Sequence, residues 1–320
     1  MVTEDKIHVE DIEWEEPSAE TVQKWYSELK MTPESVIEDV NLLREWLRHQ
    51  PHLPNVTDDK MLEIFLFQCK NSVETAKAKL EQYYVAKASM PEYFTDMDPL
   101  DAEFQQALET VCYVTLPKLT AEGYRICVCK MFNSDVTKFK PIHLFKGALM
   151  FADMSSRHGH NNGIVIIFDL QDRTMAHVAS ITYPMLKNFF HCALAAFPIR
   201  MKGFHIVNAP TYTNAMITLG KSLLKDKLKK RIHAHSKGIE TLTEHIPKDI
   251  LPPEYGGTYP HNMTVLRDLT LHLLKKHRDW FLQEAKIKAD LSKKKESGKT
   301  LTAETNIFGL EGSFRKISID

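Results

Sequence analysis

GIVIIFDL, residues 163–170, is the most informative stretch in this chain of 320 residues. Every position from Ile164 to Phe168 is apolar, as expected for a strand that is covered on both faces. Strands of this kind occur in parallel sheets with helices packed on both sides. The stretch therefore predicts a central strand of a layered α/β domain.

Three more short apolar runs surround this strand. They read RICVCKMF (125–132), GFHIVNA (203–209) and RIHAHS (231–236). Helical patterns lie between the runs at 141–156, 184–197 and 211–224, and one more helix fits 263–289. Alternation of strands and helices predicts an α/β domain around a mostly parallel sheet. We place this domain at residues 96–258 and a C-terminal helix with a polar tail at 259–320.

The chain before residue 95 shows helical periodicity only. Helices are predicted over 32–50, 58–69 and 72–88, and no strand-like run interrupts residues 18–88. Thr32 suits an N-cap and Pro33 the first helical turn. The first helix then carries one apolar stripe, formed by Val36, Val40, Leu43 and Leu47. We expect an all-α module over residues 18–95, with SMPEYFTDMDPLD (89–101) as a hinge behind it.

Charge is balanced overall but uneven along the chain. Lys and Arg total 41 and Asp and Glu total 42, a net charge of −1 that argues against a general nucleic-acid-binding protein. An acidic segment covers residues 1–17, whereas KSLLKDKLKKR (221–231) holds six cations and one Asp. The unevenness indicates that the basic segment has a local role.

Neither secretion nor membrane insertion is predicted. The N-terminus, MVTEDKIHVEDIEW, lacks the apolar core of a signal peptide, and no window approaches the roughly 18 apolar residues of a membrane span. Five cysteines, an odd number, fit reduced thiols. Cys127 and Cys129 share one face of a predicted strand and are expected to be small core side chains. We expect a cytoplasmic monomer.

Catalytic motifs are incomplete or absent. LGKS (219–222) and SGKT (297–300) resemble the end of a phosphate-binding loop, but Ala215 and Lys293 stand where the motif requires glycine. The sequence has no G-x-S-x-G elbow, no H-E-x-x-H and no C-x-x-C. Asp169 follows the central strand, and we expect it to cap the next turn. A non-enzymatic protein is predicted.

Histidine pairs raise the question of a metal. His158 and His160 lie in a Gly/Asn-rich segment, and His233 and His235 lie two apart on a predicted strand. A zinc site needs third and fourth ligands, and none can be located in the sequence. We expect no metal and no cofactor, and histidines that are exposed or hydrogen-bonded.

An ordered set of segments resembles a known family. GIVIIFDLQD, AFPIRMKGFHIVNAP, KDKLKKRIHAHS and HIPKDILPPEYGGT occur between residues 163 and 258 in the order and spacing of CRAL-TRIO lipid-binding domains, the family of the alpha-tocopherol transfer protein and the cellular retinaldehyde-binding protein. Residues 18–95 resemble the three-helix segment that precedes such domains. The tail GLEGSFRKISID is similar to the ends of insect tocopherol-transfer-like members and of clavesins.

The resemblance implies a sheet that floors an apolar cavity, closed by a mobile lid helix that would cover residues 211–224. The cargo would be one tocopherol-, retinoid- or carotenoid-like lipid, and no cofactor is implied. Carried over from the family, the residues expected to contact the lipid are Ile164, Phe168, Phe189, Cys192, Ala193, Phe197, Ile199, Met201 and Phe204. The apolar surface of the implied lid adds Met216, Leu219 and Leu223.

Cations beside the lid have a second implied role. In the tocopherol transfer protein such cations bind phosphoinositide head groups, and each Lys or Arg near an anionic membrane contributes about 1 kcal/mol. The positions that match or lie close by are Arg200, Lys202, Lys221, Lys227, Arg231 and Lys70. Phe67, in FLFQCK (65–70), stands where the family often has arginine, so head-group preference is expected to differ.

Together these features predict a protein that binds a small hydrophobic lipid and transfers it between membranes, with release coupled to phosphoinositide through the basic residues. Contact with the membrane would be peripheral and reversible. The alternative is a phosphoinositide-sensing trafficking or signalling adaptor without stoichiometric cargo.

Overall fold

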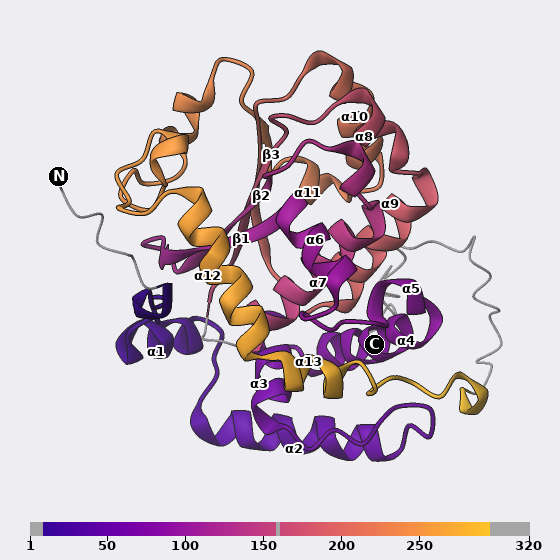
Figure 1. Cartoon of the computed structure of the whole chain (residues 1–320). Coiled ribbons are helices and arrows are strands. Elements are labelled where there is room, and N and C mark those ends of the chain that lie inside the picture. Colours follow the sequence, from indigo (N-terminus) through magenta and orange to yellow (C-terminus); the bar gives the residue numbers. More distant parts are fainter. Residues whose placement is uncertain (1–8, 158–160, 295–320) are drawn as a thin grey trace, which may run out of the picture.

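A five-stranded sheet organises the computed structural model, which describes residues 9–157 and 161–294 (Figure 1). The strand order is β1-β2-β3-β4-β5, with β1 antiparallel to β2 and all other neighbours parallel. The strands are β1 (Val111–Leu119), β2 (Tyr124–Met131), β3 (Gly163–Asp169), β4 (Met201–Val207) and β5 (Ile232–Ala234). The predicted α/β class with a mostly parallel sheet is confirmed.

Helices join the strands and cover both faces of the sheet. Along the chain the elements from β1 to β5 are joined by η2 (Val136–Lys138), α7 (Pro141–Arg157), α8 (Met175–Ser180), α9 (Tyr183–Phe190), η3 (His191–Ala196), η4 (Thr211–Thr213), α10 (Asn214–Ser222) and α11 (Asp226–Lys229). After β5 come η5 (Ile239–Glu244), η6 (Pro253–Tyr255), α12 (Met263–Lys276), α13 (Arg278–Glu284) and η7 (Leu291–Lys293). In Figure 1, α12 runs along one side of the sheet and α7, α9 and α10 lie on the other.

The helical module precedes the sheet, as predicted. Its elements are η1 (Val9–Asp11), α1 (Ala19–Glu28), α2 (Pro33–Arg48), α3 (Asp59–Gln68), α4 (Val73–Ser89) and α5 (Pro91–Phe94), and α6 (Ala102–Thr110) leads into β1. The three predicted helices correspond to α2, α3 and α4, and α1 is an additional one. The segment 89–101, expected to be a hinge, contains α5, whose Tyr93 and Phe94 are buried.

Local chemistry sets where these helices begin. Helices α1 to α4 each start with a side chain that accepts a hydrogen bond from the backbone N–H three residues later, and these caps are Ser18, Thr32, Asp58 and Ser72. Thr32 forms a capping box with Ser35, and Pro33 follows at the first helical position. These features were readable in the sequence.

The sheet separates two hydrophobic cores because side chains alternate along each strand. Ile164, Ile166 and Phe168 of β3 face the core shared with α7, α9 and the helical module. Val165 and Ile167 face the second core, built with Leu251, Tyr255 and Leu266 from the chain after β5. A third, smaller cluster joins α6, α7, α12 and α13 around Phe104, Met154 and Phe281.

Several boundaries differ from the sequence expectation. β1 was not predicted, and β4 begins at Met201 rather than at residue 203. The helix expected over 184–197 changes into the π-helix η3 after Phe190, and the helix expected over 263–289 divides at His277 into α12 and α13.

All five cysteines are buried thiols. Cys127 and Cys129 are fully buried on β2, which confirms their predicted role as core side chains. No helix within residues 9–157 and 161–294 is long and apolar enough to cross a bilayer.

Candidate functional site

A cavity of about 170 Å³ lies between the sheet and the helices of one face. Its floor comes from β1, β3, β4 and β5, and its walls come from α7, α9, η3 and the segment α10–α11. The lining side chains on the strands are Tyr113, Ile164, Ile166, Phe168, Met201, Phe204, Ile206 and Ile232. Those on α7 are Leu144, Phe145, Ala148, Phe151 and Ala152.

The lining is apolar almost throughout. Among the described residues around the cavity, Tyr113 and Lys221 alone carry polar side-chain groups. The Tyr113 hydroxyl is hydrogen-bonded to the Cys129 thiol, and burial raises the pKa of Tyr113 well above its ordinary value. A concave, mostly apolar site with few polar groups is typical of pockets for hydrophobic small molecules.

The predicted lid corresponds to η4, α10 and the turn after them. Met216, Ile217, Gly220, Lys221 and Leu224 line the cavity, whereas the opposite side of α10 is exposed. A methyl group added at Gly220 would lie 3.8 Å from the ring of Phe190, so α10 runs close to the end of α9. The amphipathic pattern read from residues 211–224 therefore has its apolar side towards the cavity.

Eight of the twelve residues expected to contact a lipid line this cavity. They are Ile164, Phe168, Phe189, Ala193, Ile199, Met201, Phe204 and Met216.

The other four lie elsewhere. Phe197 is fully buried against Tyr83 and Phe94 of the helical module, with ring centroids 5.3 and 6.4 Å away. Cys192 is also fully buried, with its sulfur 3.8 Å from that of Met90. Leu219 is 37% exposed and Leu223 is buried outside the lining.

Sequence reasoning missed the contribution of α7 and of β1. The helix over 141–156 was predicted, but no cavity role was given to its five lining side chains. The apolar stretch LFKGALMFA (144–152) was the available signal. Tyr113 was missed because its strand was not predicted.

Five cations converge where β3 and β4 begin, and we call them the basic cluster: Lys70, Arg200, Lys202, Lys227 and Arg231. Lys202 is half-buried. Burial, followed by the positive charges of the other four residues, lowers the pKa of Lys202 to about 8. Within residues 9–157 and 161–294 no carboxylate forms an ion pair with any member of the cluster. An anion bound there would meet concentrated, unneutralised charge.

Arg200 is anchored by the helical module. Its guanidinium donates to Gln68 Oε1 at 3.1 Å and to the Phe67 carbonyl at 3.1 Å, and it lies 4.4 Å from the centroid of the Phe67 ring. Phe67, at a position where the family often has arginine, thus supports a cation from β4. Burial lowers the pKa of Arg200.

The start of β3 brings the cluster close to the sheet. Gly163 has φ of +143°, and a Cβ there would lie 2.6 Å from the Arg200 carbonyl and from the Lys202 side chain. Arg231 donates to the Met201 carbonyl, so the strands β3, β4 and β5 all contribute to holding the cluster. Lys221, expected to belong with these cations, lines the cavity instead.

The histidine pair His233 and His235, at β5 and directly after it, lies with two further histidines. His233 and His235 lie on the sheet face opposite the cavity with His205 and His245, at ring-centroid distances of 4.6 to 5.7 Å. His205 Nδ1 and His235 Nε2 are hydrogen-bonded to each other at 2.9 Å. Among the described residues, no group of three or more His, Cys, Asp or Glu is arranged to hold a metal ion. His158 and His160 lie outside the described residues.

Asp169 has the structural role expected from the sequence. Its carboxylate accepts from the backbone N–H of Gln171 and pairs with Lys130, and it also accepts from Tyr255 and Asn208. It therefore caps the turn after β3 on the face opposite the cavity.

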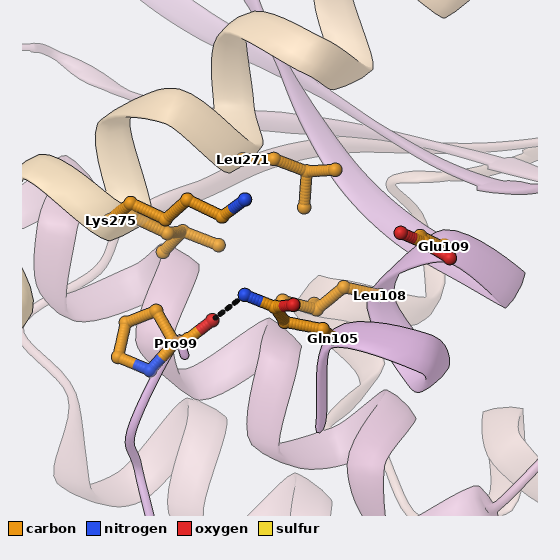
Figure 2. Close-up of a pocket in the computed structure, with 7 residues that line it drawn as sticks. Pro99, Gln105, Leu108, Glu109, Leu271 and Lys275 are labelled. Atoms are coloured by element: carbon orange, nitrogen blue, oxygen red, sulfur yellow. Dashed lines mark hydrogen bonds between the residues drawn. The ribbon is translucent and has the colours of Figure 1, made fainter. Parts of the chain in front are cut away.

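A second hollow, between α6 and α12, is far smaller (Figure 2). Its volume is about 20 Å³, enough for about one water molecule. Gln105 closes one side by donating to the Pro99 carbonyl at 3.1 Å. This hollow is not a candidate for a larger ligand.

Comparison with known families divides the chain into two matched regions. Residues 109–257 match the CRAL/TRIO domain, and residues 32–104 match the family described as Pinta-like, UBA domain. The first region contains the sheet and the cavity, and the second contains α2 to α5.

Similar proteins include human Clavesin-2, which is 28% identical over 246 residues and matches 76% of this chain and 75% of its own length. Clavesin-1 of Xenopus laevis is 27% identical over 244 residues, with 75% and 74% covered. Alpha-tocopherol transfer protein-like of Mus musculus is 28% identical over 244 residues, with 74% and 69% covered. The crystal structure of Sfh5 aligns with a TM-score of 0.45 at 13% identity, covering 82% of this chain and 99% of that one.

Proposed function

We propose that this chain holds one hydrophobic lipid beneath α10 and transfers it between membranes. Through residues 109–257 the chain belongs to the CRAL/TRIO domain family. The family binds and transfers hydrophobic lipids and is generally non-enzymatic. The observation that carries the proposal is the apolar cavity, because protein interiors are otherwise packed with few voids larger than a water molecule.

The driving force for cargo capture would be hydrophobic. Moving apolar lipid surface out of water contributes about 25 cal/mol per Å². The lining from α7, the sheet and α10 offers apolar contact on several sides, so a bound chain would be largely removed from water. A tocopherol-, retinoid- or carotenoid-like molecule fits this description, and we propose that class as cargo.

Extraction of the purified protein with organic solvent tests cargo binding directly. We expect about one hydrophobic molecule per chain, chemically unchanged after prolonged incubation with the protein. A cavity that is empty in native mass spectrometry, with intact phosphoinositide binding, would favour the adaptor alternative instead.

We further propose that the basic cluster couples release to the membrane. Lys227 lies on α11 directly after α10, and Arg231 follows at the start of β5. Phosphoinositide bound by these residues would therefore act on the segment that forms the cavity cover. Docking would loosen α10 and allow the lipid to exchange with the bilayer.

Charge reversal separates docking from cargo capture. In Lys227→Glu/Arg231→Glu we expect binding to phosphoinositide vesicles to fall by at least tenfold, because each cation contributes about 1 kcal/mol and reversal also adds repulsion. Lipid retained by the purified variant should be unchanged.

A matched control changes the same number of charges on the other side of the sheet. Lys275→Glu/Lys276→Glu alters the last turn of α12 and should leave vesicle binding within about twofold of the original protein. If both double variants bind vesicles equally well, the docking proposal is wrong.

A further inference from the structure

Arg173 is a buried cation with no carboxylate partner in the part of the chain that the structure describes. It lies between β3 and α8 and is only 2% exposed. Its Nη2 donates to the Cys129 thiol at 3.6 Å, and its guanidinium lies 4.9 Å from the centroid of the Phe168 ring. Its Nε–H has no acceptor among the described residues, and no carboxylate within them forms an ion pair with it.

Arg173 is not itself a lining residue, but the register of the sheet places its guanidinium next to the lining, against Phe168. Tyr113, Cys129, Phe168 and Ile206 form one row across β1, β2, β3 and β4. Three members of the row line the cavity, and the exception is Cys129. Since Arg173 contacts both Cys129 and Phe168, its guanidinium covers the one gap in this row.

A second buried donor that has no acceptor among the described residues lies four residues after Arg173, on His177. His177 is fully buried, and its Nδ1 accepts from the backbone N–H of Thr174 at 3.0 Å. Nδ1 therefore carries no proton, and the proton of the neutral ring must lie on Nε2. That Nε2–H has no acceptor in the described part of the chain. Burial and the charge of Arg173 both lower the pKa of His177, which keeps the ring neutral.

Nearby acidic groups do not neutralise Arg173. Asp169 is directed to the other face of the sheet, where it is held by Lys130 and Tyr255. Removing an unpaired charge from water costs several kcal/mol unless hydrogen bonds and an opposite charge compensate it. An uncompensated guanidinium beside a ligand cavity therefore points to an anionic group supplied by the ligand.

We propose that the lipid in this cavity is a carboxylic acid whose carboxylate is bound by Arg173. The inference rests on the proposed function and specifies the chemical class of the cargo. The planar guanidinium matches a carboxylate through two parallel hydrogen bonds, and its unused Nε–H supplies one of them. The hydrocarbon part then extends over Phe168 and Ile206 towards α10.

Lys221 provides an internal comparison. Lys221 is the one cation among the described residues that line the cavity, but it belongs to α10 and is partly exposed, so its ammonium can remain in water. A carboxylate bound by Lys221 would place the polar end of the lipid at the cover, opposite to the arrangement proposed here. Variants of the two residues distinguish the two orientations.

The experiment compares matched acids and alcohols by calorimetric titration into the full-length, delipidated protein. Oleic acid is paired with oleyl alcohol, and retinoic acid with retinol, each delivered from cyclodextrin. We expect the protein to prefer the acid of at least one pair by about 10- to 100-fold, the usual contribution of a hydrogen bond to a charged group. Arg173→Met should abolish this preference by weakening acid binding, Arg173→Lys should keep part of the preference, and Lys221→Met should retain the preference.

Thermal unfolding gives a second readout. Without lipid, Arg173→Met should melt at the same or a higher temperature, because an uncompensated buried charge is removed. The acid should raise the melting temperature of the original protein more than that of Arg173→Met. The inference is wrong, and the proposed function is unaffected, if the original protein binds acid and alcohol with equal affinity. The same holds if the preference for the acid is lost in Lys221→Met but kept in Arg173→Met. If neither member of either pair binds, the inference fails, whereas the proposed function is decided separately by whether a hydrophobic molecule is extracted from the purified protein.

Discussion

At neutral pH Lys202 is less firmly protonated than a lysine in water. Its pKa of about 8 results from burial and from the charges of Arg200, Arg231, Lys70 and Lys227. Between about pH 8 and 10.5 Lys202 is protonated in the unfolded chain but largely deprotonated in the folded protein. The contribution of Lys202 to the free energy of unfolding therefore increases with pH over that range. An anion bound in the cluster would offset the repulsion and favour the charged form.

This shift predicts a pH dependence of vesicle binding. Between pH 7 and 9 the free protein loses the Lys202 charge, so affinity for phosphoinositide vesicles should fall by several-fold in that range. Lys202→Arg retains its charge and should lack this fall. Both affinities are measured by vesicle sedimentation at each pH, and the affinity of the original protein is divided by that of Lys202→Arg. Titration of the phosphoinositide phosphates affects both proteins alike and does not change this ratio. A ratio that is constant from pH 7 to 9 contradicts the prediction.

Individual site residues could be predicted in part from sequence. Cations at the start of an apolar strand are conspicuous, and the resemblance gave Arg200, Lys202, Lys227 and Arg231 a shared role. Arg173 could not be found, because nothing in QDRTM (171–175) indicates that its guanidinium folds back onto Cys129 and becomes buried. Burial of a long polar side chain depends on tertiary contacts that leave no local pattern.

Among the elements, the π-helix η3 is held by a residue that is distant in sequence. It supplies Ala193 and Leu194 to the cavity wall. Lys79 of α4 donates to the carbonyls of Leu194 at 2.9 Å and Ala195 at 3.3 Å, and also to that of Phe197. Burial lowers the pKa of Lys79 to about 8, and these carbonyls are the acceptors of its ammonium group. The helical module thereby fixes one wall of the cavity.

Replacement of Lys79 should destabilise the protein. Lys79→Met leaves these carbonyls of η3 without their donor, and we expect the free energy of unfolding to fall by about 1–3 kcal/mol. Lys77→Met on the same helix removes only a surface ion pair with Glu74 and should cost less than about 1 kcal/mol. Urea denaturation of both variants checks this. Equal midpoints would show that the carbonyls find other donors.

The differences between expected and observed elements have physical causes. β1 contains Pro117 and an irregular register between Thr115 and Leu119, features that weaken a strand pattern in sequence. Cys192 and Phe197 were assigned to the cavity from the resemblance, but they pack against the helical module, while Ala193 and Leu194 of η3 line the cavity. The π-helical hydrogen bonding of η3 cannot be seen in apolar periodicity, which assumes one helical period.

For the whole molecule, a buried polar network joins parts that are distant in sequence. Lys87 of α4 and Glu284 of α13 form an ion pair at 2.9 Å in which both side chains are almost fully buried. The Tyr83 hydroxyl lies 2.9 Å from Asp153 of α7 and 3.2 Å from Glu284. The helical module, the sheet domain and the C-terminal helix are therefore linked by groups that cannot separate without exposing buried charge.

Breaking this network should affect the molecule as a unit. Glu284→Ala leaves the Lys87 ammonium buried without its carboxylate, and we expect a loss of about 3–5 kcal/mol. The double variant Lys87→Met/Glu284→Leu should recover most of that loss, because an apolar pair replaces both charges. Chemical denaturation should show a single transition in each case.

The surface ion pair between Arg278 and Asp98 is the control for this prediction. Arg278→Ala should leave the denaturation midpoint close to that of the original protein, because surface ion pairs contribute little to stability. If Lys87→Met/Glu284→Leu is as unstable as Glu284→Ala, the packing around Lys87 and Glu284, rather than their charges, holds the helical module and the C-terminal helix together.

The alternation of side chains along β3, and along β4 from Phe204 to Val207, has an evolutionary consequence. Enlarging or shortening Ile166 or Phe204 reshapes the space offered to a guest, while Val165, Ile167 and Val207 keep the opposite layer intact. Proteins that descend from one ancestor with this fold can therefore change ligand specificity through single substitutions on the cavity face of the sheet. The hydrophobic core on the opposite face is left unchanged by such substitutions.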